Sequence, residues 1–325
     1  MLMVKVVVAY CHELEHCVSI DDARREFFYL DENKRKRFNF SCSDRQCNAL
    51  ISGVNYHVKA EEGQKFKAAH FKTPHPHKHS LDCEWIKFTE EIELPTKREG
   101  ESDAEFKERK ARQKLNDWIT HFNPTPDDDN QNIVDRPPNV NPAHLANTHI
   151  NENRLDNKAP QKFSEYTRTN QLQRLINTWM DAKKNLSNEE FYSLNITIPI
   201  YRKIPLYKYI TYIGKGLTNE YEGVIYGNAR LRQRYEKGFL LDFYPTFENK
   251  KIELYVSKDI MNNSRLGHYV DEILKDEEAD YFQVFMLNPT SEIRKNKYDK
   301  EVIQLKIENL RNFAIYLKIK QKKDV

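Results

Sequence analysis

The feature that most constrains this sequence is one short window that holds most of its candidate metal ligands. Cys42, Cys47 and Cys83 lie in this window together with five of the eleven histidines of the chain, His57, His70, His75, His77 and His79. Thiolate and imidazole are the ligands that Zn2+ prefers in a closed tetrahedral site. A small, loop-rich segment buries little apolar surface, so a structural metal is a common substitute for a larger core. The clustering therefore favours metal binding over disulfides.

The ligand count predicts one Zn2+ per chain, held by three cysteines and one histidine. Cys42 and Cys47 are separated by four residues, which suits a turn that pinches one ion. His79 and Cys83 have three residues between them, which favours His79 as the fourth ligand. His70 is the alternative, because the aromatic residue that follows it would fix its backbone in a small core. The competing interpretation is that the cysteines are independent small apolar residues and the histidines lie in a solvated loop.

The rest of the chain divides by composition into further segments. Residues 1–95 are the predicted zinc-binding domain, and an amphipathic pattern predicts a connecting helix within 96–122. Residues 123–162 are rich in proline, aspartate and asparagine, which is typical of a flexible linker. Residues 163–325 open with a second amphipathic helix and continue as a β-rich domain. We therefore expect an α+β protein with a helical connector and a linker.

Strands are predicted throughout the C-terminal third, where tyrosine, phenylalanine, isoleucine and valine gather in runs bounded by glycine, asparagine or proline. The runs are Tyr207 to Ile213, Gly223 to Arg232, Gly238 to Tyr244, Lys251 to Val256, Tyr281 to Leu287 and Val302 to Leu317, with a helix expected from Leu266 to Glu278. Three strands, a helix and two strands is the order of the five-stranded oligonucleotide-binding barrel, the OB-fold. A small sandwich would give the same order, so both architectures stay open.

A basic and aromatic stretch from Tyr226 to Tyr235, which begins in the second of these runs, predicts a nucleic-acid contact. Arg230, Arg232 and Arg234 alternate, so a regular strand would place all three on one face with Tyr226 in register. Guanidinium groups neutralise phosphates while aromatic rings stack on bases. The alternative is a solvated strand face whose arginines pair with nearby carboxylates.

The overall charge limits the kind of partner. With Lys+Arg at 52 and Asp+Glu at 49, the net charge of +3 is too small for a binder that uses its whole surface against polyanions. Any basic surface must be local. The sequence has no apolar stretch long enough for a membrane span, and its start is too short and too charged for a signal peptide, so we expect a cytoplasmic protein without a membrane partner.

Catalytic motifs are not readable in this sequence. A nuclease of the restriction-endonuclease type needs an aspartate and, later, an acidic residue two positions before a lysine. Asp242 and Glu253 are the nearest candidates, but Tyr255 stands where the lysine belongs. Phosphate-binding glycine loops and serine nucleophile elbows are also missing from the sequence. We therefore expect a non-catalytic, zinc-containing nucleic-acid-binding protein, of DNA or RNA. A protein-interaction subunit of a larger bacterial complex and a diverged metal-dependent nuclease are the alternatives.

Residues 3–85 also resemble a known family. An N-terminal strand, the segment Ser19 to Ala23, the cysteine pair, His70 followed by Phe71, and the final Cys83 resemble the zinc-binding region of CoiA-like competence proteins of bacteria. The cysteine pair is spaced more widely here, and Thr73 replaces a second histidine. The resemblance implies a zinc-binding role in DNA uptake, or in defence against phages and mobile elements. The nuclease domain associated with that family is not recognisable.

Overall fold

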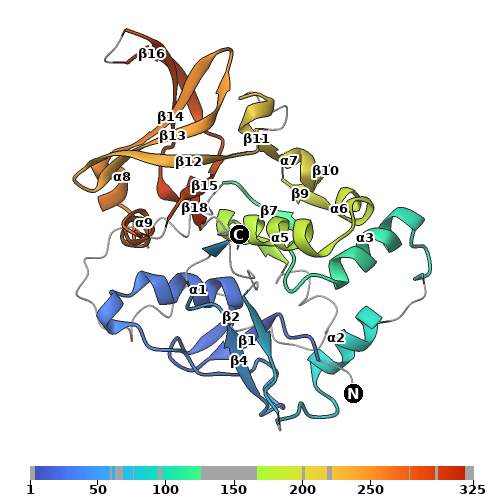
Figure 1. The fold of residues 1–325 in the computed structure, drawn as a ribbon. Helices are drawn as coiled ribbons and strands as arrows, with labels where there is room; N and C mark the ends of the chain where they lie inside the picture. Colours follow the sequence, from blue (N-terminus) through green and yellow to red (C-terminus); the bar gives the residue numbers. More distant parts are fainter. Residues whose placement is uncertain are drawn as a thin grey trace, which may run out of the picture. The chain divides into compact units, whose positions relative to one another are not determined.

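The computed structural model describes residues 4–58, 61–62, 69–75, 77–93, 97–125, 167–199, 202–217, 222–277, 279–296 and 299–318. It contains helices and several β-sheets, so the α+β prediction is confirmed (Figure 1). The chain divides into two compact units. The first unit comprises residues 1–57 and 68–203, and the second comprises 58–67 and 204–325. No helix among these described segments has the length and hydropathy needed to cross a membrane.

The first unit begins with a mostly antiparallel sheet of order β2-β1-β3-β4-β6. Its strands are β1 (Val8–Cys11), β2 (His16–Ser19), β3 (Phe40–Cys42), β4 (Leu50–Val54) and β6 (His70–Lys72). Helix α1 (Ile20–Tyr29) follows β2 directly and is succeeded by the short helix η1 (Glu32–Lys34). Ser19 and Asp22 form a capping box at the start of α1, which satisfies backbone donors that a helix otherwise leaves open.

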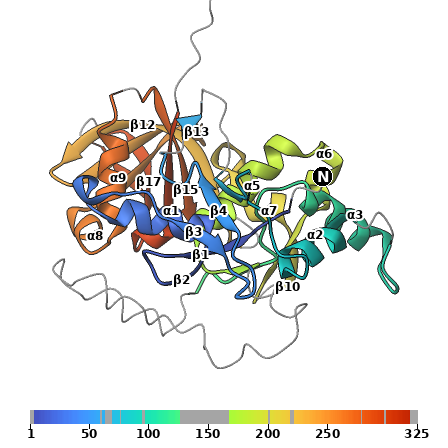
Figure 2. The same ribbon diagram turned by 90° about the horizontal axis from the view of Figure 1, so that it is seen from below.

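The remaining described elements of the first unit are α2 (Glu84–Glu93), α3 (Asp103–Gln113), β7 (His121–Phe122), β8 (Arg168–Thr169), α5 (Leu172–Asn185), α6 (Asn188–Ser193), β9 (Asn195–Ile198) and β10 (Arg202–Pro205). The strands form a second sheet of order β10-β9-β7-β8. Strand β10 and helices α3, α5 and α6 of this unit are labelled in Figure 2. Helix α5 buries Leu175, Ile176 and Trp179, which recur at helical spacing and explain why this segment is a helix.

The predicted connecting helix is shorter than its apolar pattern indicates. Helix α3 ends at Gln113, and the chain then turns before β7. The backbone N–H of Asn116 donates a hydrogen bond to the Asp181 carboxylate at 2.8 Å. The backbone N–H of Trp118 donates one to the Asp117 carboxylate, also at 2.8 Å. These side-chain acceptors replace helical hydrogen bonds and end the helix. Of the predicted linker, residues 126–162 lie outside the described part of the chain.

The second unit is built on a nine-stranded sheet, whose main path runs β16-β17-β14-β13-β12-β15-β18-β5, with β11 paired to β12. The strands are β5 (Glu61–Glu62), β11 (Ile210–Tyr212), β12 (Val224–Tyr235), β13 (Gly238–Phe247), β14 (Lys250–Val256), β15 (Tyr281–Leu287), β16 (Thr290–Lys295), β17 (Glu301–Lys306) and β18 (Phe313–Lys318). The helices are α7 (Leu206–Tyr209), η5 (Ile213–Lys215), α8 (Lys258–Asn262), α9 (Leu266–Leu274) and η6 (Leu310–Asn312).

Three details of this sheet differ from the predicted strands. The run from Tyr207 starts with the helical turn α7 before β11. The run from Val302 is divided into β17 and β18 by η6, where the Asn309 side chain accepts the Arg311 backbone N–H at 2.9 Å. Strand β16 was not predicted, because all six of its residues are exposed and it lacks an apolar pattern.

The two sides of the sheet differ in character. Phe239, Leu241 and Phe243 are buried at alternate positions of β13 and belong to the apolar core. Asp242 points to the other side, where it stands opposite Arg230 of β12 and Glu253 of β14. We call the side that carries Arg230, Asp242 and Glu253 the polar face.

Candidate functional site

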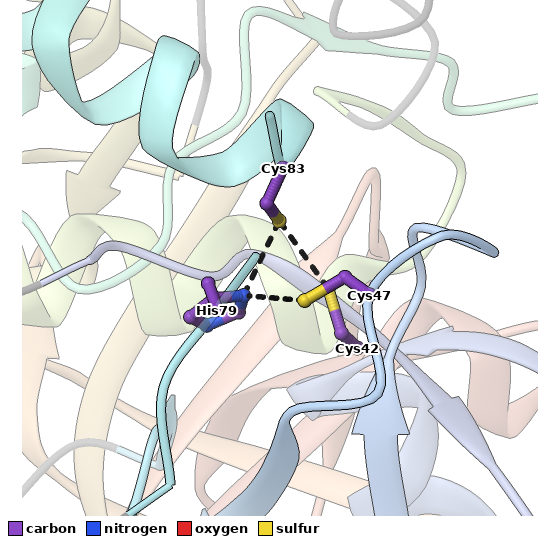
Figure 3. Close-up of side chains that lie close together, drawn as sticks. All are labelled: Cys42, Cys47, His79 and Cys83. Carbon is purple, nitrogen blue, oxygen red and sulfur yellow. Dashed lines mark hydrogen bonds between the residues drawn. The ribbon is translucent and has the colours of Figure 1, made fainter. Parts of the chain in front are cut away.

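The structure brings Cys42, Cys47, His79 and Cys83 together in the first unit (Figure 3). All four side chains are buried, and their candidate ligand atoms all lie within 4.8 Å of one another. Cys42 and Cys47 come from the end of β3 and the following turn, and Cys83 directly precedes α2. Three cysteines and one histidine are a ligand set compatible with a metal site.

Three distances within this group are close to the edges of a tetrahedron around one ion. The Sγ atoms of Cys42 and Cys83 are 3.7 Å apart. The Nδ1 atom of His79 lies 3.4 Å from Cys47 Sγ and 3.3 Å from Cys83 Sγ. With Zn–S bonds of about 2.3 Å and a Zn–N bond of about 2.0 Å, a regular tetrahedron has S–S edges of about 3.8 Å and S–N edges of about 3.5 Å. The three distances are close to these edges, and all the candidate ligand atoms lie within 4.8 Å of one another.

The surroundings of the group orient its ligands. The Nε2 atom of His79 lies 2.8 Å from Thr73 Oγ1, so a proton on Nε2 leaves Nδ1 free to act as the ligand. The Ser80 backbone N–H donates to Cys47 Sγ at 3.3 Å, which helps to hold this sulfur in place.

Asp44 and Ser43 fasten the two halves of the site to each other. The Asp44 carboxylate accepts the Gln46 backbone N–H at 3.0 Å and the Glu84 backbone N–H, at the start of α2, at 3.0 Å. A carboxylate at a helix N-terminus is favourable because of the helix dipole. The indole of Trp85, fully buried, donates to Ser43 Oγ at 2.8 Å. These residues were not predicted as part of the site, although they lie close to Cys42 or Cys83 in the sequence.

The contact between the thiols of Cys42 and Cys83 shifts their pKa values in opposite directions. The hydrogen bond from Cys42, with help from His79, lowers the pKa of Cys83 to about 4. The same contact with Cys83, together with burial, raises the pKa of Cys42.

His70, the alternative fourth ligand, is not part of the group. It lies in β6, where it pairs with Val54 of β4. Within the described residues, the structure places His79 and not His70 beside the cysteines. The three-residue spacing between His79 and Cys83 therefore predicted the candidate fourth ligand better than the aromatic residue that follows His70.

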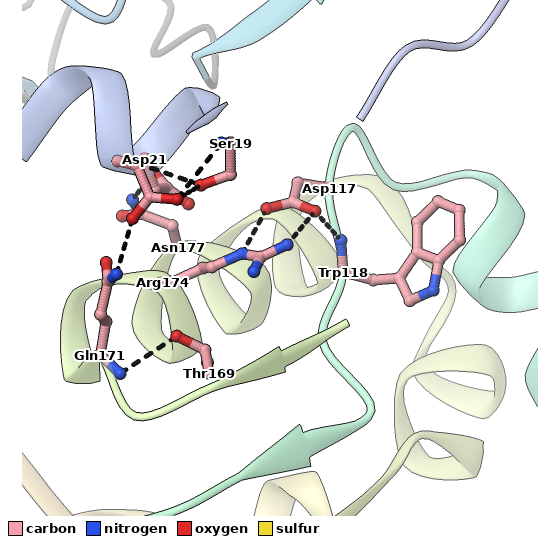
Figure 4. Close-up of polar contacts among 9 residues, drawn as sticks. Ser19, Asp21, Asp117, Trp118, Thr169, Gln171, Arg174 and Asn177 are labelled. Carbon is pink, nitrogen blue, oxygen red and sulfur yellow. Dashed lines mark hydrogen bonds and ion pairs between the residues drawn. The ribbon is translucent and has the colours of Figure 1, made fainter. Parts of the chain in front are cut away.

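A second polar cluster of the first unit joins α1 to α5 (Figure 4). Arg174 forms a two-pronged ion pair with Asp117, at 2.9 and 3.1 Å. Asn177 donates to Asp21 at 2.7 Å, and Gln171 donates to Asp22 at 2.6 Å. Because these groups satisfy one another in a buried setting, the cluster fits a structural role.

Burial and the nearby charge of Asp117 raise the pKa of Asp21 to about 7. Asp22 behaves in the opposite way: although burial opposes ionisation, Arg25 and its hydrogen-bond partners lower its pKa to about 2.

The three arginines predicted to share one strand face do not do so. A bulge in β12 shifts its register against β13 between Leu231 and Gln233. As a result, Arg230 stands opposite Asp242, whereas Arg234 stands opposite the core residue Phe239. Arg234 therefore lies on the apolar side, where it forms an ion pair with Asp271 of α9. The prediction of one continuous arginine face is wrong, because it assumed an unbroken strand.

The two remaining arginines lie on the polar face beside carboxylates. Arg232 is the extra residue of the bulge and pairs with Glu253 and, at 3.3 Å, with Asp242. Arg230 is 62% exposed and 3.9 Å from Asp242. Tyr226 shares the face but is half-buried, and its ring stacks on Phe285 at 5.3 Å. Its pKa is raised by burial.

Three exposed tyrosines of the same sheet were not predicted as site residues. Tyr244 of β13 is 54% exposed, Tyr235 of β12 is 42% exposed and Tyr255 of β14 is 36% exposed. Tyr235 and Tyr255 contact each other edge to face at 5.9 Å, and Tyr244 contacts Tyr281 at 6.3 Å. Tyr255 alternates with Glu253 on β14, which places it on the polar face and is visible in the sequence. The register of β13 against β14 shifts after Asp242, so Tyr244 is placed on this face by its contact with Tyr281, which alternates with Phe285, the residue opposite Tyr226.

In comparisons with known proteins, the chain matches no family model, no curated protein and no solved structure.

Proposed function

We propose that this chain is a nucleic-acid-binding protein whose first unit is stabilised by zinc. The zinc proposal rests on the edge lengths of the Cys3His group, 3.7, 3.4 and 3.3 Å, which suit Zn2+ and its bond lengths. Four protein ligands leave no open position for substrate or water, so the metal would be structural. It would join the turn after β3 to the start of α2.

Metal analysis of the purified protein tests this assignment. We expect one zinc per chain, and a Cys47→Ser variant that loses the metal together with much of its thermal stability, because the binding energy of a structural zinc is folding energy. Cys17→Ser is the matched control, since this thiol lies outside the group. A zinc content well below one, with Cys47→Ser as stable as the wild type, would contradict the proposal.

The pairing of the second unit's strands supports an OB-like barrel. Strands β12, β13 and β14 form a meander, β15 pairs with β12, and helices α8 and α9 lie between β14 and β15 in sequence. The last predicted strand is split, but its first part, β17, pairs parallel with β14 and its second part, β18, pairs antiparallel with β15. One interrupted fifth strand thus links the two ends of the other four. In OB-folds the face of the second and third strands binds oligonucleotides.

The observation that carries nucleic-acid binding is the exposure of Tyr244, Tyr255 and Arg230 on this face. Stacking on aromatic rings and neutralisation of phosphates are the two contacts that single strands require. Tyr244 and Tyr255 lie on β13 and β14, which are the second and third strands of the proposed barrel. The nuclease alternative is less favoured, because both oxygens of Glu253 are engaged by arginines.

Binding of labelled oligonucleotides, single-stranded and duplex, at two salt concentrations tests this function. We expect Tyr244→Ala combined with Tyr255→Ala to weaken single-strand binding about tenfold or more, because each stacked base is worth about 1–3 kcal/mol. Arg230→Glu should weaken binding and lower the salt dependence by about one phosphate contact. Lys208→Glu, an exposed charge reversal on α7 in the same unit, is the matched control.

The outcomes separate the candidate functions. A wild-type protein that binds no polynucleotide contradicts the proposal and favours the protein-interaction alternative. If the double tyrosine variant binds as tightly as the wild type, the polar face is not the binding surface. The CoiA-like resemblance adds the proposal that such binding serves DNA uptake or defence, and it rests on the first unit only.

A further inference from the structure

Arg232 and Arg294 come from separate segments and meet on one carboxylate. Arg232 lies in the bulge of β12, and Arg294 lies on β16, at the far edge of the sheet path. Both contact Glu253 of β14: Arg232 pairs with Oε1, and Arg294 pairs with Oε2 at 3.0 Å. Each carboxylate oxygen therefore holds its own guanidinium group.

This ion-pair cluster is buried at one end and open at the other. Glu253 is 0% exposed, whereas the side chains of Arg232 and Arg294 are 28% and 41% exposed. Burying a carboxylate is costly, and replacing a buried ion pair by apolar residues is often neutral or stabilising. Stability alone is thus a weak reason for this arrangement. A carboxylate that orients two half-exposed arginines is also suited to binding.

The arginines keep donors for a ligand. Arg232 uses Nη1 for both Glu253 and Asp242. With its amide oxygen toward Arg294, Gln304 accepts from Nε at 3.1 Å and from Nη2 at 3.0 Å. An arginine has five N–H donors in a rigid fork, so within the described part of the chain Nε and Nη2 of Arg232 and Nη1 of Arg294 remain for an anion.

The charges of the cluster sum to +1. Its guanidinium groups are those of Arg230, Arg232 and Arg294, and its carboxylates are those of Asp242 and Glu253. A phosphodiester carries one negative charge, so it would neutralise the cluster. We propose that Glu253 is a positioning residue, which holds Arg232 and Arg294 as a clamp for one phosphate of the bound strand.

This inference rests on the proposed nucleic-acid binding and predicts an effect opposite to that of simple charge. Glu253→Gln removes a negative charge, so long-range electrostatics alone would tighten the binding of a polyanion. If Glu253 positions the two guanidinium groups, the same variant weakens binding about fivefold or more, although it has lost a negative charge. Glu292→Gln is the matched control, because Glu292 pairs with Lys306 and is 47% exposed. This control should bind as tightly as the wild type or more tightly.

The experiment measures the affinity of a labelled single-stranded oligonucleotide for the wild type and for these variants. Arg294→Lys keeps the charge but loses the fork, so it should also weaken binding. Glu253→Gln that binds as tightly as the wild type or more tightly overturns the inference and leaves the proposed function standing. If Glu253→Gln fails to fold, as read from circular dichroism, Arg294→Lys decides: full affinity overturns the clamp, and reduced affinity supports it. A wild type that binds no polynucleotide overturns both proposals.

Discussion

Thr73 contacts His79, the histidine that lies beside the cysteines of the candidate metal site. Its hydroxyl lies 2.8 Å from Nε2 of His79 and thereby fixes the ring so that Nδ1 faces the thiols. Removing such a partner of a ligand histidine usually costs about 10-fold to 100-fold in metal affinity. We predict a loss of this size for Thr73→Val, measured by competition with a chromogenic zinc chelator.

Ser80→Ala is the control for that experiment. The contact of Ser80 with Cys47 Sγ comes from its backbone N–H and survives the substitution. Its metal affinity should therefore equal that of the wild type. An unchanged affinity in Thr73→Val would show that the ring is held by packing instead.

Asp21 gives the first unit a pH dependence of stability with a defined sign. Burial and Asp117 raise its pKa from 3.8 to about 7, while Arg174 and Arg24 oppose this rise. The folded state therefore binds the proton more tightly than the unfolded state. This group's contribution is most favourable below about pH 4 and is lost as the pH rises through about 7. We predict that Asp21→Asn is more stable than the wild type at about pH 7.5, by about 1 kcal/mol or more, since one pKa unit corresponds to about 1.4 kcal/mol.

Urea unfolding of the zinc-loaded protein at about pH 5 and about pH 7.5 checks this prediction. The advantage of Asp21→Asn should shrink at the lower pH, where the native carboxyl group is protonated. Asp22 does not produce the same trend, because its pKa is lowered to about 2 and its effect falls below about pH 4. Equal stability of the two proteins at the higher pH would show that Asp21 is ionised at little cost.

At the scale of elements, the bulge in β12 separates arginines that look equivalent in the sequence. Arg234 pairs with Asp271 of α9 on the core side, while Arg230 stays on the polar face. We predict that Arg234→Ala destabilises the second unit by about 1 kcal/mol or more, because it leaves a partly buried carboxylate with one partner fewer. Arg230→Ala should leave stability unchanged and weaken oligonucleotide binding.

Thermal unfolding and oligonucleotide titration of both variants provide the check. The reverse pattern, with Arg230→Ala unstable and Arg234→Ala deficient only in binding, would mean that the strand has no bulge in solution.

The same bulge is a feature of the strands that the sequence pattern does not predict. The apolar pattern of the sequence finds α5 from its helical spacing, and finds strands β12 to β15 as runs of aromatic and aliphatic residues bounded by glycine, asparagine or proline. It misses β16, whose residues are all exposed, and the break at η6, where a polar side chain caps a turn inside an apolar run. Register shifts are invisible to it, since an extra residue changes which neighbours a strand meets without changing composition.

The candidate metal site was more accessible to sequence reasoning than the polar face. Three thiols in one short window have few functions in common other than metal binding, so the sequence predicts them as candidate ligands. The spacing to Cys83 predicts His79 as the fourth, and the structure places it beside them. The polar face depends on residues of β12, β13, β14 and β16 that only strand pairing brings together. Arg294 is the clearest example, because it is 41 positions from Glu253 along the chain.

At the scale of the whole molecule, the candidate metal site and the polar face belong to different compact units. We predict that a strong chelator abolishes one cooperative unfolding transition and leaves the other in place. The affected transition belongs to the first unit, since its sheet and α2 are joined through the proposed zinc ligands. Oligonucleotide binding through the second unit should persist after metal removal. Calorimetry of the full chain, followed by oligonucleotide titration of the chelated protein, measures both effects. Loss of binding in step with loss of metal would instead assign the first unit a direct part in holding nucleic acid.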